Sequence, residues 1–240
     1  MTLRLFVDPP LAAGTTLALP PGAARHAQVR RVQPGDVLTL FDGLGADWPA
    51  EVLAMGRREV TVRVGAPRAV DNELRCAVTL ALGMPANERM DALVEKATEL
   101  GVARLQPLLC ERSVLRLDGE RAARKREHWQ AVAVAACEQS GRSRVPVVEP
   151  VAPLAAWLAA GAGSGTRLLL SPHPGARPLA ALVGADASAL CSLSGPEGGL
   201  TPAEEAAAAA AGFAPASLGS RVLRADTAPL ALLAWLGLRG

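Results

Sequence analysis

A cluster of glycines near the C-terminal end of the chain is the feature best suited to hold a polar ligand. Residues 190–193 form a short apolar run typical of a buried strand, and Gly195, Gly198 and Gly199 follow it closely. Because glycine has no Cβ, backbone N–H groups at these positions can approach a ligand. The pattern predicts a binding loop after a strand, although a lone glycine cluster is often only a tight turn.

The loop leads into a helix whose first turn is well specified by the sequence. Thr201, Pro202 and Glu204 fit a capping box, with Thr at the N-cap, Pro at the first helical position and Glu at the third. Strand, glycine loop and helix N-terminus together predict a cradle for a polar ligand.

A second glycine cluster, residues 218–227, follows that helix and reads LGSRVLRADT. It contains Gly219, Arg224 and Asp226 and stands ahead of an apolar segment. Arginine stays charged and offers several hydrogen-bond donors, so Arg224 is suited to grip an anion.

The two clusters together resemble the cofactor site of the SPOUT methyltransferases. The whole chain resembles the bacterial family that methylates N3 of a uridine in 16S ribosomal RNA. The further blocks that carry this resemblance are RLFVD at 4–8, HAQVRRVQPGD at 26–36, RMDALVEKATELGV at 89–102, CERSV at 110–114 and HWQAVAVAACEQSGRSRVP at 128–146.

The resemblance implies a two-domain α/β protein. A small PUA-like, RNA-binding β-barrel is expected in residues 1–70, and a SPOUT domain with a mostly parallel sheet and a C-terminal trefoil knot in residues 75–240. The polar stretch 68–73 is the expected linker, because hydrophobic patterning lapses there. Short strands punctuated by Gly and Pro in the first part agree with a small barrel.

The resemblance also implies S-adenosylmethionine as cofactor, held by three loops that converge on it. The residues expected to bind it are Leu170, Ser171, Pro172, Leu193, Ser194, Gly195, Pro196, Glu197, Gly198, Gly199, Leu218, Gly219, Val222, Leu223, Thr227 and Ala228.

Methylation of uridine N3 sets a chemical requirement on the site. N3 carries a proton and is a poor nucleophile until that proton leaves, so a cation must stabilise the anion and a base must accept the proton. Arg224 and Asp226 are the candidate catalytic residues. The alternative is that the two merely pair with each other to fix the knot.

RNA contacts are expected from basic side chains, although the net charge is only +2. The expected partner is 16S ribosomal RNA or the small subunit. The basic run at 121–126 could equally be a solvated helix face. The candidate RNA-binding residues are Arg25, His26, Arg30, Arg31, Arg112 and Arg142.

A homodimer is expected because SPOUT enzymes generally pair through the knotted domain. Trp129, Val132 and Trp235 offer apolar surface for such a contact. For Glu111 and Glu138, capping or pairing at a subunit contact is as good an interpretation as RNA contact.

The chain departs from the family pattern at three places. Arg25 and His26 stand where two histidines are common, Ala86 stands near a usual basic residue, and Asp226 replaces a frequent glutamate. Ala86 puts one RNA contact in doubt, and the shorter Asp226 weakens any role that depends on reach.

Composition indicates a cytoplasmic globular protein without metal. Half of the residues are hydrophobic, and neither a signal peptide nor a long apolar run is evident. The four cysteines lie far apart in apolar surroundings, so we expect reduced core thiols rather than disulfides or ligands.

Local patterns predict the elements around the site. Strands are expected at 37–41, 60–64, 76–82 and 167–170, and helices at 90–100, 129–137, 154–160 and 227–238, with a polar loop at 138–142. Gly161, Gly163 and Gly165 follow a helix and precede a strand, so they do not fit a Rossmann dinucleotide motif.

Two other functions remain open at this stage. One is a SPOUT methyltransferase that acts on a different ribosomal or transfer RNA nucleotide, since the cofactor loops do not name the base. The other is a noncatalytic RNA-binding assembly factor that has kept the fold.

Overall fold

The computed structural model describes residues 2–8, 10–57 and 59–239. The chain divides into two compact units. The first takes the described residues up to Glu73 together with Val134–Val145, and the second takes Leu74–Ala133 and the described residues from Pro146 onward. The expected linker ends where this division falls, but the sequence did not predict that residues 134–145 join the first unit.

The first unit is a six-stranded mixed sheet with one helix. The strand order is β1–β3–β4–β5–β2, with β6 beside β4, and β1 runs parallel to β3 while the other pairs are antiparallel. Within the described residues β1 and β2 remain edges, so the ladder is open and is not a closed barrel. Its elements are β1 (Arg4–Phe6), β2 (Thr16–Ala18), α1 (Pro21–Val29), β3 (Val37–Phe41), β4 (Ala46–Met55), β5 (Val60–Val64) and β6 (Arg68–Ala69).

The strands of this unit form because their apolar residues alternate. In β5, Val60, Val62 and Val64 are buried and the two residues between them are not. They share a core with Leu5, Leu40 and the alanines of α1. The strands predicted at 37–41 and 60–64 are confirmed with the same bounds.

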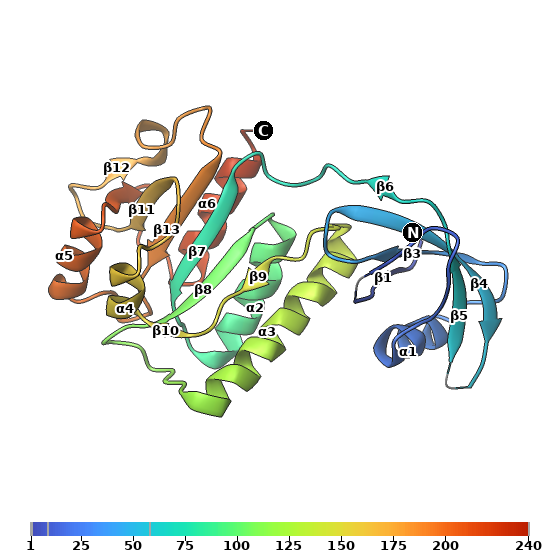
Figure 1. Cartoon of the computed structure of the whole chain (residues 1–240). Coiled ribbons are helices and arrows are strands. Elements are labelled where there is room, and N and C mark those ends of the chain that lie inside the picture. The colour runs from blue at the N-terminus through green and yellow to red at the C-terminus, as the bar shows by residue number, and fades with distance from the viewer. Residues whose placement is uncertain (1, 9, 58, 240) are drawn as a thin grey trace. The chain divides into compact units, whose positions relative to one another are not determined.

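The second unit is an all-parallel sheet covered by helices (Figure 1). The strand order is β10–β8–β7–β13–β11–β14–β12, with β9 beside β8. A parallel sheet needs cover on both faces, which explains its continuous apolar strands. The elements are β7 (Ala77–Gly83), α2 (Asn87–Glu99), β8 (Arg104–Leu109), α3 (Gly119–Ser140), β9 (Val147–Val148), β10 (Ala152–Pro153), α4 (Leu154–Ala159), β11 (Thr166–Leu170), β12 (Arg177–Pro178), η1 (Leu179–Ala181), β13 (Ala189–Ser194), α5 (Pro202–Ala210), β14 (Ala214–Ser217) and α6 (Thr227–Gly237).

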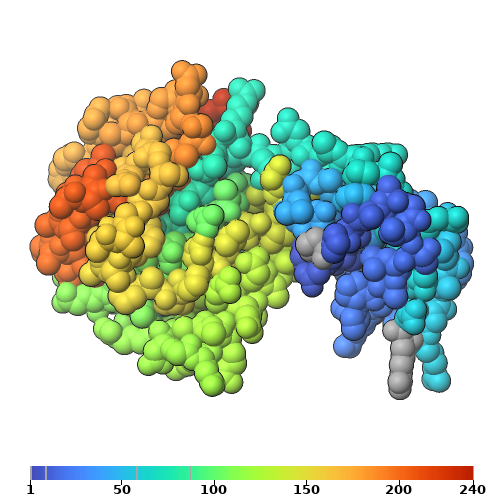
Figure 2. Space-filling view, in the orientation of Figure 1, coloured from blue at the N-terminus to red at the C-terminus, as the bar shows by residue number. Residues whose placement is uncertain are grey.

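The two faces of this sheet have separate cores. On one face α4 and α5 pack together, with Trp157 against Phe213, and in the space-filling view they lie side by side in yellow and red-orange (Figure 2). On the other face α2, α6 and the first part of α3 share the largest core cluster. The last helix thus packs into the interior through Leu232 and Leu233, as a knotted C-terminus requires.

Several local predictions are confirmed. Gly101, with φ +92°, ends α2, and the three glycines at 161, 163 and 165 connect α4 to β11 with positive φ. The polar loop expected at 138–142 is wrong in part, because α3 continues through Ser140. The helix predicted at 129–137 is therefore only the later part of a longer one.

Trp129 does not supply the apolar surface that we expected for a dimer. Its side chain is completely buried in the second unit, and its indole N–H donates to Asp91 Oδ1 at 2.9 Å. Val132 and Trp235 are only partly buried, and Arg239 stacks on the Trp235 ring.

In the described part of the chain, no helix combines the length and hydropathy needed to cross a membrane. The four cysteines are buried and free. Burial raises the pKa of the Cys110, Cys137 and Cys191 thiols to about 12.

Candidate functional site

The candidate site lies where the loops after β11, β13 and β14 meet. The three strands are neighbours in the parallel sheet, so their carboxyl ends open at the same edge, where α/β folds bind ligands. A pocket of about 570 Å³ opens there. It is lined by Arg89, Leu169, Leu170, Ser171, Pro172, Ser194, Gly195, Pro196, Glu197, Gly198, Gly199, Leu200, Glu205, Val222, Leu223, Arg224, Ala225 and Ala228.

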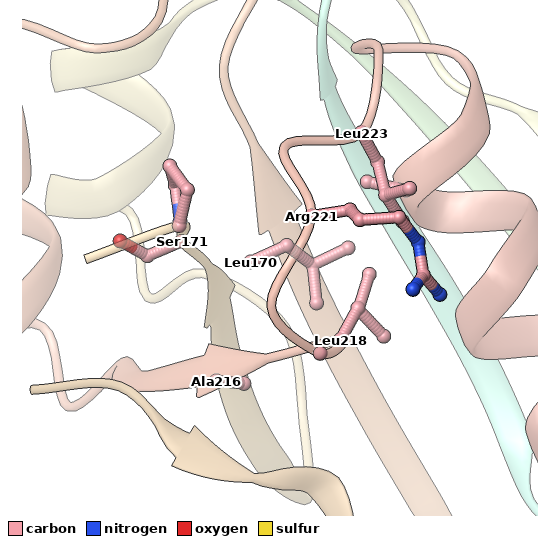
Figure 3. A pocket seen from close by; sticks show the side chains of 9 residues that line it. Leu170, Ser171, Ala216, Leu218, Arg221 and Leu223 are labelled. Atoms are coloured by element: carbon pink, nitrogen blue, oxygen red, sulfur yellow. The ribbon is translucent and has the colours of Figure 1, made fainter. Parts of the chain in front are cut away.

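A smaller pocket of about 60 Å³ adjoins it and shares part of its lining. Figure 3 shows Leu170, Leu218 and Leu223 gathered around this space, with Ala216 and Ser171 at its border. Arg221 also lines this space, so it is a mainly apolar slot with one charged side chain. Such a slot beside a wider pocket with charged side chains suits a ligand that has a flat ring at one end and charges at the other.

Most residues that the sequence predicted for the cofactor line one of these two pockets. Two do not. The Leu193 side chain is fully buried in the core beneath α4 and α5, and Thr227 begins α6 outside both linings. Strand periodicity explains the position of the Leu193 side chain, because Leu193 and Ser194 point to opposite faces of the sheet.

The loop after β13 makes a tight turn at its glycines. Gly199 has φ +67°, and its N–H donates to Pro196 O at 2.8 Å. A Cβ on Gly195 would lie 2.8 Å from Leu200 N, which is too close for any other residue. Gly198 differs, because its φ is not positive and a Cβ there would meet Arg112 Cβ at 3.1 Å. The absence of a side chain at Gly198 therefore makes room for Arg112 rather than only for a ligand.

The helix after this loop begins as predicted. Thr201 Oγ1 accepts from Glu204 N at 3.3 Å, and Glu204 Oε2 accepts from Thr201 N at 2.8 Å, which completes the capping box before Pro202. Glu204 Oε1 accepts a further bond from Glu111 N at 2.8 Å. One carboxylate thus caps α5 and ties it to the turn after β8.

The same loop is also held by the start of α2. Glu197 Oε1 accepts from Ala86 N at 3.0 Å and from Arg89 Nη1 at 3.4 Å. Ala86 takes part through its backbone, so this contact does not need the basic side chain that the family pattern has nearby. Arg89 was missed as a site residue, although it opens one of the sequence blocks that carry the resemblance.

The two catalytic candidates are placed differently. Arg224 is exposed and lines the large pocket. Asp226 is the N-cap residue of α6, lies outside the lining, and its Oδ1 is enclosed without a hydrogen-bond partner among the described residues. No ion pair between Arg224 and Asp226 occurs in the described chain, so the alternative that they pair with each other is wrong. The carboxylates in the lining are instead Glu197 and Glu205.

A histidine stands beside the pocket. His173, in the loop after β11, places Nε2 3.6 Å from Oε2 of Glu205. His128 does not line the pocket, and its Nε2 lies 2.9 Å from Asp91 Oδ2.

Three of the candidate RNA-binding arginines are exposed in the first unit, on α1 and at its end. They are Arg25, Arg30 and Arg31. Arg31 has φ +56°, which makes it the one non-glycine residue with positive φ in the described chain. His26 is partly buried, with Nδ1 3.5 Å from Glu138 Oε2.

The other two arginines are already engaged within the protein. Arg142 is 3 % exposed and forms an ion pair with Glu73, so we correct its assignment from RNA contact to structural residue. Arg112 donates to Gly198 O and Leu200 O of the glycine loop at 3.1 and 3.2 Å. The residue is exposed, and its guanidinium lies against the glycine loop.

Comparison with known proteins shows the family of the chain. A family model described as an RNA methyltransferase domain matches residues 72–237, and one described as an RNA methyltransferase PUA domain matches residues 19–65. The protein called ribosomal RNA small subunit methyltransferase E is 35 % identical in Synechocystis, over 98 % of this chain and 77 % of that one. The protein of the same name in Bacillus subtilis is 31 % identical, over 84 % and 81 %.

Two solved structures are similar over nearly the whole chain. Ribosomal RNA small subunit methyltransferase E from Neisseria gonorrhoeae, bound to S-adenosylmethionine, superposes with a TM-score of 0.90 at 34 % identity, covering 98 % of this chain and 97 % of that one. A putative methyltransferase from Legionella pneumophila with the same bound cofactor has a TM-score of 0.91 at 31 % identity, with the same coverage.

Proposed function

The chain belongs to the RNA methyltransferase family, and from that premise we propose that it methylates N3 of a specific uridine in 16S ribosomal RNA, with S-adenosylmethionine as donor. The observation that carries this proposal is the pocket where the three loops meet. Its glycine turn and its apolar slot match a cofactor with an adenine ring at one end and an amino acid at the other.

The residues of the pocket divide the recognition between them. Leu170, Leu218 and Leu223 provide apolar walls for the adenine, and backbone groups of the glycine loop meet the polar parts. S-adenosylmethionine supplies a methyl group on a sulfonium, which makes that carbon an electrophile. The protein's task is to hold uridine N3 in line with it.

Arg224 is the residue to which we assign stabilisation of the uridine anion. When N3 loses its proton, negative charge spreads to the base oxygens, and a guanidinium in the pocket lowers the energy of that state. N3 then bonds to the methyl carbon as the carbon–sulfur bond breaks. The proton goes to a carboxylate of the lining or to water, and Asp226 is not needed for this step because it lies outside the lining.

We assign RNA positioning to the first unit. Arg25, Arg30 and Arg31 are exposed and close together in sequence on α1 and its end, where their charges can meet phosphates. The target base must leave the stack to reach a pocket of this depth, as in other enzymes that modify bases. We further propose that the protein works in the cytoplasm as a homodimer.

Methyl transfer to ribosomal particles tests the proposal. Small subunits from a bacterium that lacks the modification are incubated with the protein and with S-adenosylmethionine that carries a tritiated methyl group. We expect label in 16S RNA that depends on the protein. Cofactor binding without any transfer to RNA or particles would instead support a noncatalytic factor, and label only in transfer RNA would support a different substrate.

A further inference from the structure

We propose that Arg112 is a positioning residue that holds the glycine loop of residues 195–200 in the conformation that binds the cofactor. The inference rests on the proposed function, since it concerns the same pocket. It assigns to Arg112 a role in cofactor affinity instead of the phosphate contact that its charge suggested.

The turn that carries Arg112 is closed by hydrogen bonds of its own. It follows β8 directly, and Ser113 closes it twice, with its N–H on Cys110 O at 3.1 Å and its Oγ accepting from Cys110 N at 3.0 Å. The Ser113 side chain is buried, at 5 % exposure. Arg112 therefore projects from a turn whose conformation is stabilised by these two hydrogen bonds.

The guanidinium bonds the carbonyls on both sides of Gly199. Its Nη1 donates to Gly198 O at 3.1 Å and to Leu200 O at 3.2 Å, and these carbonyls flank Gly199, whose φ is +67°. One donor group thus fixes the orientation of two carbonyls around the residue with left-handed backbone. Bonds from a charged group are among the stronger ones available to a carbonyl.

The packing of Gly198 supports the same assignment. A Cβ at this position would be 3.1 Å from Arg112 Cβ and 3.5 Å from Arg112 Cδ, so the arginine stem lies directly against the loop backbone. The adjacent residue adds a second tie, because Glu111 N donates to the Glu204 carboxylate that caps α5. The turn of residues 110–113 thereby braces the loop and the helix that follows it.

A brace of this kind matters because glycines lose much conformational freedom when they are ordered. Gly195, Gly198 and Gly199 lie in a short segment that lines the pocket. If the loop is held before the cofactor arrives, less free energy is lost on binding, and affinity rises. Without Arg112, the glycine loop would be ordered only when the cofactor binds, and the lost conformational entropy would lower the affinity.

The test compares three variants by calorimetric titration with S-adenosylmethionine in the absence of RNA. For Arg112→Ala we expect affinity to fall roughly tenfold, the effect of losing bonds from a charged donor. Arg112→Lys should retain part of the affinity, because an ammonium can still donate to a carbonyl. Arg124→Ala is the control, since it removes an equal charge from an exposed position on α3 whose ion-pair partner is Glu120 at 3.8 Å, and it should bind as the wild type does.

Kinetics and thermal melting separate positioning from a general structural role. Arg112→Ala should raise KM for S-adenosylmethionine about as much as Kd, leave kcat at saturating cofactor near the wild-type value, and melt near the wild-type temperature without ligand. Wild-type affinity in Arg112→Ala, with weaker RNA binding alone, would overturn the inference and restore the phosphate role. A wild-type protein that does not bind S-adenosylmethionine would overturn the proposed function as well.

Discussion

Single residues in this pocket act largely through their backbone. Gly195 leaves no room for a Cβ, and Gly199, with φ +67°, adopts without strain a backbone that residues with side chains disfavour. Gly219, with φ +111°, does so in the loop after β14. The large pocket is lined by two arginines, Arg89 and Arg224. Arg89 pairs with Glu197 at 3.4 Å, so we assign stabilisation of the developing uridine anion to Arg224. Backbone recognition explains why the site was visible in the sequence as glycine clusters.

Gly219→Val should weaken S-adenosylmethionine binding by at least about tenfold, because a β-branched residue strongly disfavours φ +111° and the backbone must move away from the pocket. Calorimetric titration measures the change. Gly184→Val is the matched control, since Gly184 has open space, no positive φ and no place in the pocket lining. Equal affinity in the two variants would contradict the assignment of the loop.

Arginines in the two units should have separable effects. Replacing Arg30 and Arg31 by Ala should weaken RNA binding and flatten its salt dependence, while turnover at saturating RNA stays nearly intact. Arg224→Ala should bind cofactor and RNA almost as well but transfer methyl slowly, because its interaction is strongest in the transition state.

Filter binding at two salt concentrations and single-turnover methylation measure these effects. If Arg224→Ala transfers methyl at the wild-type rate when RNA is saturating, Arg224 only helps to dock the RNA, and its assignment to the transition state is wrong.

At the level of elements, short periodic strands were predictable with their bounds, whereas the extent of the long helix α3 was not. The strands at 37–41 and 60–64 and the capped start of α5 follow from alternation and capping chemistry, which are local. The length of α3 and the assignment of its end to the first unit depend on distant partners. Glu138 accepts from Phe6 N at 2.9 Å, and Arg142 pairs with Glu73, and neither contact leaves a local pattern.

The elements of the site were likewise predictable only where a local sequence pattern marks them. The glycine loops were found because glycine marks a special backbone. Arg89 and Arg112 were not assigned to the pocket, because nothing in the spacing of residues 89, 112 and 198 reveals that α2 and the turn after β8 hold one loop. The side chain of Leu193 lies in the core, because the residues of a strand alternate between the two faces of the sheet.

The capping box should make a measurable contribution to stability. Thr201→Ala removes the oxygen that accepts from Glu204 N, and we expect it to lower the free energy of unfolding by about 1 kcal/mol. Urea denaturation measures this. Thr227→Ala, at the start of α6, is the control, because the N-cap of that helix is Asp226, which makes no capping hydrogen bond from its side chain. A Thr201→Ala variant as stable as the wild type would contradict the capping role.

For the whole molecule, we expect a homodimer in solution. With Trp129 buried, the apolar surface must come from other residues, and Trp235 and Leu238 of the C-terminal segment are candidates because they are partly or largely exposed. Light scattering at micromolar concentration should give twice the mass of one chain. A monomer mass there would contradict the proposal, and Leu238→Glu should shift the dimer toward monomer if this segment forms the contact.

We propose that the two units have separate tasks, with RNA positioning in the first unit and methyl transfer in the second. The second unit contains every residue of both pocket linings at the candidate site, and the first unit carries the exposed arginines of α1. Neither unit alone accounts for base-specific methylation of a large RNA, because one lacks the pocket and the other lacks those arginines.

The most direct test of the account is the identity of the methylated nucleoside. Small subunits that lack the modification are incubated with the protein and labelled S-adenosylmethionine, and the 16S RNA is digested to nucleosides and separated against standards. The account predicts that the label co-migrates with 3-methyluridine, and that Arg224→Ala gives the same product at a much lower rate. Label in a ribose-methylated or carbon-methylated nucleoside, or no label in RNA at all, would contradict it.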